Sequence, residues 1–316
     1  MTQTKLSKLL KQYNPIILDG AMATEIEKHG IALDSELWSA AIIQEHPEIV
    51  KQVHLDYFKS GADIATTNTY QATLLGFQQS GYSEQEAEQI ICKTVQLAAH
   101  ARAEFWASLS PQQQASRPYP LIAGSVGPYG AYLADGSEYS GDYTLNEGGY
   151  RMFHQSRMQL LKKAGTDLFA FETMPNFAET QALAKLLRDA FPQDEAWLSF
   201  SLKDPEHLCD GTPLAEAAAF FKDNDQIAAI GVNCFSMLKI DQAIPVIRST
   251  TNKPIIVYPN SGEKYHPIKK IWISSRNRPR FYEASKTWSK AGASLIGGCC
   301  RTSPDDIREI TEWARA

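Results

Sequence analysis

The stretch SLIGGCC, residues 294–300, joins a short apolar run to two glycines and two adjacent cysteines. It is the last of eight apolar runs along the chain; the others are PIILDG (15–20), DIATTNTY (63–70), PLIAGSVGP (120–128), DLFAFETMP (167–175), AWLSFSL (196–202), AIGVNCF (229–235) and PIIVYPNSG (254–262). Continuous apolar runs of this length are typical of parallel strands that are buried on both faces. Eight of them predict an α/β fold, a single (β/α)8 TIM barrel.

Helical periodicity between the runs favours the same fold. In residues 83–109, apolar side chains such as Ala87, Ile90 and Ile91 recur with the spacing of an amphipathic helix. The alternative is an open doubly wound sheet, which normally carries a G-x-G-x-x-G turn after its first strand. The segment LDGAMATEIEKHG (18–30) lacks that turn, so we expect one barrel domain over residues 1–316.

Composition limits the partners. The chain of 316 residues has 31 basic and 36 acidic side chains and a formal net charge of −5, so neither nucleic acid nor a membrane surface is an expected partner. Lys5, Lys8 and Lys11 interrupt the N-terminal apolar residues, so a signal peptide is not expected. Five cysteines, an odd number, do not fit a secreted disulfide framework. The sequence therefore predicts a cytoplasmic protein whose cysteines serve as thiols or metal ligands.

Polar residues lie at the C-terminal ends of seven of the eight apolar runs, where a barrel places its active site. These positions are Asp19 and Gly20, Thr67 and Asn68, Ser125 and Gly127, Glu172 and Thr173, Asn233 and Cys234, Asn260 and Ser261, and Cys299 and Cys300. The cysteines come from the sixth and eighth runs, which a closed barrel separates by one strand. A metal site is therefore geometrically possible.

The adjacency of Cys299 and Cys300 needs a break in the strand, because successive strand residues point to opposite faces. We expect Gly297 and Gly298 to give the backbone that freedom. Three thiolates leave one tetrahedral position of a zinc ion open, as in catalytic zinc sites, whereas structural sites use four ligands.

Such a site favours thiol chemistry. Three thiolates more than cancel the charge of Zn²⁺, which makes the ion a weak Lewis acid for water. A thiol substrate in the fourth position would be held as a nucleophilic thiolate, although its free pKa is about 8.5. This inference favours thiol alkylation over hydrolysis.

Seven motifs resemble the homocysteine S-methyltransferases, most closely the branch that uses S-methylmethionine or S-adenosylmethionine. They are ILDGAMAT (17–24), TTNTY (66–70), AGSVGPYGAYLADGSEY (123–139), FETMPN (171–176), GVNC (231–234), PNSG (259–262) and GGCC (297–300). The resemblance implies that zinc-bound homocysteine thiolate attacks the methyl group of a sulfonium donor in line and becomes methionine, without a protein general base.

The resemblance also implies roles for single residues. Cys234, Cys299 and Cys300 match the zinc ligands. The expected substrate-binding residues are Asp19 and Glu172 near the homocysteine ammonium, Gly20 and Ala21 at a helix start that would take its carboxylate, Asn260 near the open metal position, and Thr67, Asn68 and Ser125 on the pocket wall. The plainer interpretations are a helix cap for Asp19 and a structural carboxylate for Glu172.

The sequence does not decide which methyl donor is used or whether the working protein contains a metal. Aromatic faces attract sulfonium cations, and the candidates after strand ends are Trp38, Tyr70, Tyr129, Tyr132, Tyr139 and Tyr143. Betaine is an alternative donor, although betaine-using relatives have longer chains. A metal-free redox switch that uses Cys299 and Cys300 is an alternative of another class.

Overall fold

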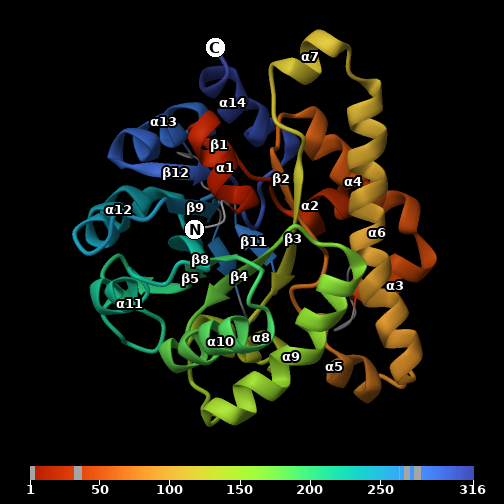
Figure 1. Cartoon of the computed structure of the whole chain (residues 1–316), viewed down its shortest axis with the longest axis vertical. Helices are drawn as coiled ribbons and strands as arrows, with labels where there is room; N and C mark the ends of the chain where they lie inside the picture. The colour runs from red at the N-terminus through yellow and green to blue at the C-terminus, as the bar shows by residue number, and fades with distance from the viewer. Residues whose placement is uncertain (1–3, 32–37, 263, 267–270, 274–278) are drawn as a thin grey trace.

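Eight parallel strands form a barrel in the computed structural model, which describes residues 4–31, 38–262, 264–266, 271–273 and 279–316 (Figure 1). The strands are β1 (Ile16–Ile17), β2 (Ile64–Thr66), β3 (Leu121–Val126), β4 (Leu168–Met174), β5 (Ala196–Phe200), β8 (Ile227–Ser236), β9 (Ile255–Asn260) and β12 (Ala293–Ile296). Each overlaps one of the eight apolar runs, so the predicted barrel is confirmed.

The sheet closes on itself between its first and last members. Its order is β1-β12-β9-β8-β5-β4-β3-β2, with parallel pairing throughout. Leu18, directly after β1, forms a parallel bridge with Ile64 of β2, and the Asp19 N–H donates to the Ile64 carbonyl at 3.0 Å. The open doubly wound alternative is therefore wrong.

Helices surround the barrel in Figure 1. They are α1 (Lys5–Gln12), α2 (Met22–Lys28), α3 (Trp38–Glu45), α4 (Pro47–Lys59), α5 (Leu74–Gln79), α6 (Glu84–Ser108), α7 (Pro111–Ala115), α8 (Tyr129–Leu133), α9 (Glu147–Ala164), α10 (Phe177–Ala190), α11 (Leu214–Phe220), α12 (Ile240–Arg248), α13 (Phe281–Ala291) and α14 (Pro304–Ala314), with 3-10 turns η1 (Ser137–Tyr139) and η2 (Met237–Lys239). Helix α6 matches the periodicity of residues 83–109 and starts at a capping box of Ser83 and Glu86. Within the described residues, no helix has the length and apolar character needed to cross a bilayer.

Two hairpins were not predicted from the sequence. They pair β6 (Leu202–Asp204) with β7 (His207–Leu208) and β10 (Lys264–His266) with β11 (Ile271–Ile273). Both follow the C-terminal end of a barrel strand, β5 and β9 respectively, so they extend the loops on that side.

The apolar core has two layers. One fills the barrel and includes Leu18, Trp197 and Tyr258, while a larger one lies between strands and helices. Leu6 and Leu9 of α1 belong to the inner layer, and the Leu6 N–H donates to Glu195, just before β5, at 2.9 Å. Helix α1 therefore covers the N-terminal end of the barrel and leaves the C-terminal end for a site (Figure 1).

His54 of α4 gives this fold a pH dependence. The side chain is fully buried, both ring nitrogens lack a hydrogen-bond partner within the described chain, and burial lowers its pKa from 6.5 to about 4. The unfolded chain therefore binds a proton that the folded chain refuses, and stability falls as the pH drops below about 6.5. The difference between 6.5 and about 4 corresponds to about 3 kcal/mol.

We expect His54→Leu to remove most of this acid penalty. Urea unfolding at pH 7.5 and pH 4.5 would measure it: the loss of stability between the two should be smaller than in the wild type by about 2 to 3 kcal/mol. His100→Leu is the matched control, because His100 is exposed on α6. Equal acid losses in the wild type and His54→Leu would contradict the assignment.

Candidate active site

Three thiols meet at the C-terminal end of the barrel. Cys234 lies in β8, Cys299 and Cys300 follow β12, and β9 lies between these strands. The three Sγ atoms lie within 4.8 Å of one another, and those of Cys234 and Cys300 are 3.7 Å apart. A zinc tetrahedron with bonds of about 2.3 Å has edges of about 3.8 Å. The cluster thus has the composition and spacing to hold a metal ion, as no other group of three or more His, Cys, Asp or Glu does among the described residues.

Breaks in the strand register present Cys234 and Glu172 at this end. The β8–β9 pairing shifts between Asn233 and Ser236, and the β4–β5 pairing shifts between Phe171 and Met174. Cys234 has φ 49° and Thr173 has φ 59°, a left-handed conformation that is unfavourable for non-glycine residues. Such irregularities redirect side chains that a regular strand would alternate.

The Asn233 side chain forms hydrogen bonds between the two irregular strand segments. Its Oδ1 accepts from the Thr173 N–H at 2.7 Å and from the Ser199 hydroxyl at 2.7 Å. Its Nδ2 donates to Thr173 Oγ1 at 2.8 Å, and 3.9 Å separates Nδ2 from Cys299 Sγ. The buried amide thus stabilises the strained Thr173 and stands next to the strained Cys234 in the chain, and we infer that it is a positioning residue for the site.

The glycines before the cysteine pair act through close packing. A Cβ on Gly297 would lie 2.5 Å from Leu18 Cβ, and one on Gly298 would lie 2.3 Å from Thr302 Oγ1. Neither glycine has a positive φ; the turn is made instead at Arg301, with φ 66°. The expectation that these glycines supply unusual backbone freedom is therefore wrong, because their role is to admit neighbouring atoms.

The thiols differ in acidity. Hydrogen bonds from Cys299 and Cys300 hold the pKa of Cys234 well below its usual value, and the Tyr139 hydroxyl, 3.6 Å from its Sγ, acts in the same direction. The same contacts raise the pKa values of Cys299 and Cys300. The cluster thus loses its first proton more readily than an isolated cysteine does, because hydrogen bonds between the thiols stabilise the resulting charge.

Two carboxyl groups are buried near the thiols. Asp19 is 5% exposed and Glu172 is 9% exposed. Burial, together with the nearby charge of Glu172, raises the pKa of Asp19 to about 8, and burial raises that of Glu172 to about 7. Asp19 Oδ2 accepts from the Thr66 N–H at 2.8 Å, and Ser125 donates to Glu172 Oε1. Two neighbouring acidic groups with raised pKa values suit a cationic ligand, which would favour their charged forms.

The predicted pocket-wall residues lie at the same end. Thr67 Oγ1 accepts from the Ser125 N–H at 3.0 Å, so this pair ties β2 to β3. Asn260 Nδ2 donates to the Cys234 carbonyl at 3.1 Å. Several polar atoms here are buried without a partner in the described chain: Asn68 Nδ2, Tyr70 Oη, Glu138 Oε2, Asn260 Oδ1 and Ser261 Oγ. Unsatisfied buried groups are uncommon, so this concentration indicates a place for a polar ligand.

The remaining predicted residues belong to the helix start after β1 and to the proposed donor pocket. Helix α2 starts after Ala21, where a helix start was expected. The Ala21 N–H itself donates to Thr302 Oγ1 at 3.2 Å, so a substrate carboxylate would have to use the N–H groups of the first turn of α2. Gly20 packs against the same threonine and Tyr57. The ring of Tyr129 packs against Tyr132, Tyr143 and Phe153, with centroids 5.0 to 5.8 Å apart. Trp38 begins α3, and its side chain lies outside the described residues.

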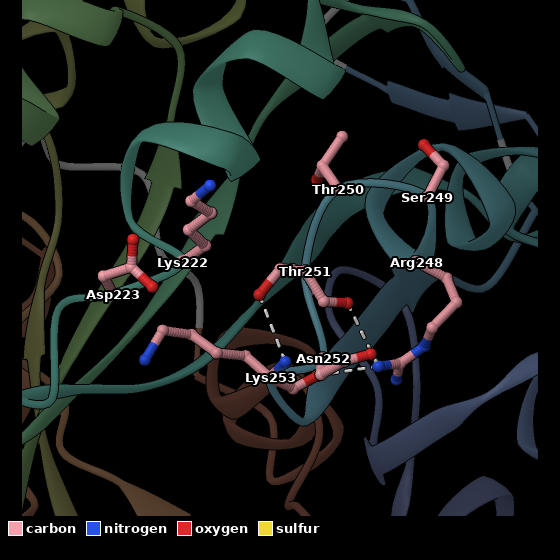
Figure 2. Close-up of a pocket in the computed structure, with 8 residues that line it drawn as sticks. All are labelled: Lys222, Asp223, Arg248, Ser249, Thr250, Thr251, Asn252 and Lys253. Atoms are coloured by element: carbon pink, nitrogen blue, oxygen red, sulfur yellow. Dashed lines mark hydrogen bonds between the residues drawn. The ribbon is translucent and has the colours of Figure 1, made fainter.

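A surface hollow of about 460 Å³ lies elsewhere, lined by residues 222–223 and 248–253 (Figure 2). These segments precede β8 and β9, so the hollow is at the N-terminal ends of the strands, away from the thiols. Arg248 donates to the carbonyls of Thr251 and Lys253 at 3.3 and 3.2 Å, and Lys253 donates to Asn224 at 2.8 Å. Its cations thus serve the local backbone, and the chemistry lies at the other end.

The fold and the thiol cluster define a class, the TIM barrels that bring three thiols together at the C-terminal ends of their strands with a spacing that could hold a metal ion. The family profile described as homocysteine S-methyltransferase matches residues 16–314, and the chain belongs to this family. It is 49% identical over 311 residues to homocysteine S-methyltransferase YbgG of Bacillus subtilis, covering 98% of both chains. It is 46% identical over 306 residues to homocysteine S-methyltransferase of Escherichia coli, covering 96% and 97%. The metallated form of homocysteine methyltransferase MmuM from Escherichia coli superposes with a TM-score of 0.87 at 44% identity, covering 97% and 99%.

Proposed function

We propose that this chain transfers a methyl group from S-methylmethionine to the sulfur of homocysteine and yields methionine. Residues 1–316 would act as one homocysteine-binding domain, with zinc held by Cys234, Cys299 and Cys300. The observation that carries the proposal is the meeting of three thiols with two buried carboxyl groups at the open end of the barrel. All five cysteines are unpaired thiols, which fits a reducing compartment such as the cytoplasm.

Asp19 and Glu172 would hold the ammonium group of homocysteine. Their pKa values are raised because burial outweighs the hydrogen bonds that they accept and, at Glu172, the charge of Arg157, so a further positive charge would stabilise both carboxylates. A bound ammonium ion supplies that charge, so substrate binding favours both carboxylates and releases the protons that they carry at neutral pH. The plainer roles stay compatible, since Asp19 also accepts from Thr66, which fixes the direction of its carboxylate.

The thiol of homocysteine would release its proton to solvent on binding, before methyl transfer. Zinc would supply the positive charge that keeps the substrate sulfur deprotonated at neutral pH. The sulfur lone pair then forms a bond to the donor methyl carbon as the methyl–sulfonium bond breaks, and the leaving sulfur becomes a neutral thioether. No proton moves in that step, so positioning of the two substrates provides the rate.

An assay with purified, zinc-loaded protein tests the proposal. We expect methionine from homocysteine faster with S-methylmethionine than with S-adenosylmethionine, and none with methyltetrahydrofolate. Each S-methylmethionine consumed should yield two methionines, because both the acceptor and the demethylated donor become methionine. Homoserine, which carries oxygen in place of sulfur, is the matched acceptor control and should yield no methylated product. Comparable turnover with methyltetrahydrofolate in the absence of other proteins would refute the choice of donor.

A further inference from the structure

Glu138 is a carboxylate of the barrel mouth that the proposed function leaves without a role. It lies in η1, within the segment between β3 and α9, next to Tyr139, whose hydroxyl contacts Cys234 Sγ at 3.6 Å. The turn is well fixed: the Gly141 N–H donates to the Ser137 carbonyl at 2.8 Å. A Cβ on Gly130 would lie 2.7 Å from Glu138 N, so α8 packs directly against this backbone. The carboxylate is therefore carried by an anchored turn beside the thiols.

The carboxylate of Glu138 is only partly satisfied. Its Oε2 is buried and accepts no hydrogen bond from any residue that the structure describes. Burial raises the pKa of Glu138, and the nearby Cys234 and Asp135 raise it further. The buried Tyr70 hydroxyl is close by: after burial itself, Glu138 and Cys234 contribute most to raising its pKa. An acidic oxygen buried without a counter-charge is costly, which points to a cation as its missing partner.

The proposed reaction brings such a cation to this place. The donor has a positive sulfonium, and its methyl group must come within about 3 to 3.5 Å of the attacking sulfur. Asp19, which follows β1, and Glu172, on β4, are assigned to the ammonium of homocysteine, so the donor needs a counter-charge of its own. Glu138 and Tyr70 lie in the segments that follow β3 and β2, and both interact electrostatically with Cys234.

We propose that Glu138 is the binding residue for the positive charge of the methyl donor, with Tyr70 beside it. The inference rests on the proposed function, because that function supplies the cationic substrate. Transfer of the methyl group turns the sulfonium into a neutral thioether, so the attraction is lost when the reaction is complete. The carboxylate thus binds the donor more tightly than the product and favours release of methionine. Its contribution is larger in the ground state than in the transition state, where the charge is already dispersed, so it acts mainly on KM.

The test compares Glu138→Gln with Asp142→Asn in zinc-loaded protein. Asp142 is an exposed carboxylate of the same segment, so both variants lose one negative charge. For Glu138→Gln we expect the KM for S-methylmethionine to rise about ten- to a hundredfold, as for loss of a charged hydrogen-bonding partner. The KM for homocysteine and the zinc content should change less than about twofold. Asp142→Asn should leave all three within about twofold.

Binding without turnover separates this proposal from the proposed function. Calorimetry of S-methylmethionine with zinc-loaded protein, in the absence of homocysteine, should show the same rise of Kd in Glu138→Gln. A wild-type protein that binds S-methylmethionine through Glu138 but forms no methionine would refute the reaction and leave the binding residue in place. Dimethylsulfonioacetate has a sulfonium but no ammonium, so it tests which charge Glu138 binds. An equal loss of affinity in Glu138→Gln is expected for a sulfonium-binding residue, and no loss would overturn the inference, because Glu138 would then bind the ammonium, which keeps its charge in the product.

Glu138→Asp keeps the charge and shortens the side chain, so it should give a smaller loss of donor affinity with an unchanged circular dichroism spectrum. An unchanged donor Kd in Glu138→Gln would overturn the inference. A parallel loss of homocysteine affinity or zinc would also overturn it, because Glu138 would then act on the thiol site as a whole.

Discussion

Cys234→Ser, Cys299→Ser and Cys300→Ser should each abolish stoichiometric metal binding and lower the rate of methionine formation by more than about a hundredfold. The physical reason is that a neutral hydroxyl replaces one of three thiolates, so the site loses both affinity and negative charge. Loss of a mere outer partner of a metal ligand costs about 10- to 100-fold, and loss of a ligand should exceed that. Metal per chain after purification under reducing conditions, measured by atomic emission, is the primary readout; we expect close to one zinc in the wild type.

Cys92→Ser and Cys209→Ser are matched controls with the same chemical change. Cys92 Sγ lies 3.9 Å from the Leu160 carbonyl, and Cys209 Sγ lies 3.4 Å from Ser201 Oγ. Both should retain metal and activity. Full activity of a metal-free wild-type protein would refute the mechanism, and loss of metal in the controls would show that serine acts through the fold.

The barrel could be predicted because its strands are buried on both faces. PIIVYPNSG and DLFAFETMP read as continuous apolar runs, and these became β9 and β4. The hairpins β6–β7 and β10–β11 could not, because their two or three residues per strand do not establish a period. The pairing of β1 with β2 is also invisible locally, since closure depends on all eight strands together.

The candidate site was predictable where residue types are rare. Adjacent cysteines after a strand indicate a metal site, and the three thiols do meet. The sequence did not predict the positive φ values of Cys234 and Thr173. It also did not predict the hydrogen bonds between Asn233 and Thr173, because the identity of an asparagine does not indicate its tertiary partner. Gly297 and Gly298 were interpreted as flexible, although close packing explains them. No sequence pattern singled out Glu138, since burial of a loop carboxylate depends on distant strands.

Arg157, His154 and Glu179 form a buried charged chain that sequence patterns also missed. Arg157 is 1% exposed, and the other two are fully buried. Arg157 donates to His154 Nδ1 at 2.9 Å, which fixes the proton on Nε2, and Nε2 donates to Glu179 Oε1 at 2.7 Å. Burial lowers the pKa of His154, consistent with a neutral ring between the two charges.

Hydrogen bonds from this buried network hold the loops that carry the proposed donor site. Arg157 donates to the Tyr70 carbonyl at 2.9 Å and to the Gly127 carbonyl at 2.6 Å, after β2 and β3. Glu179 accepts from the Tyr129 N–H at 2.6 Å and from the Tyr143 hydroxyl at 2.5 Å. Helices α9 and α10 thereby hold both ends of the segment that contains Glu138.

Arg157→Met should therefore destabilise the protein by about 3 to 5 kcal/mol, the usual effect of leaving a buried charge unpaired. Glu179 would keep its neutral donors but lose the positive charge at the other end of the imidazole. Arg151→Met on the same helix is the matched control, because Arg151 pairs with Asp189 at 2.9 Å and its side chain is 31% exposed. A surface pair contributes at most about 1 kcal/mol, so urea unfolding should separate the two variants clearly.

Similar losses of stability in Arg157→Met and Arg151→Met would mean that Arg157 acts through its aliphatic packing alone. Arg157→Lys then decides the point: a lysine keeps the charge but cannot reach all three acceptors in the fixed geometry of a guanidinium, so recovery of only part of the stability is expected.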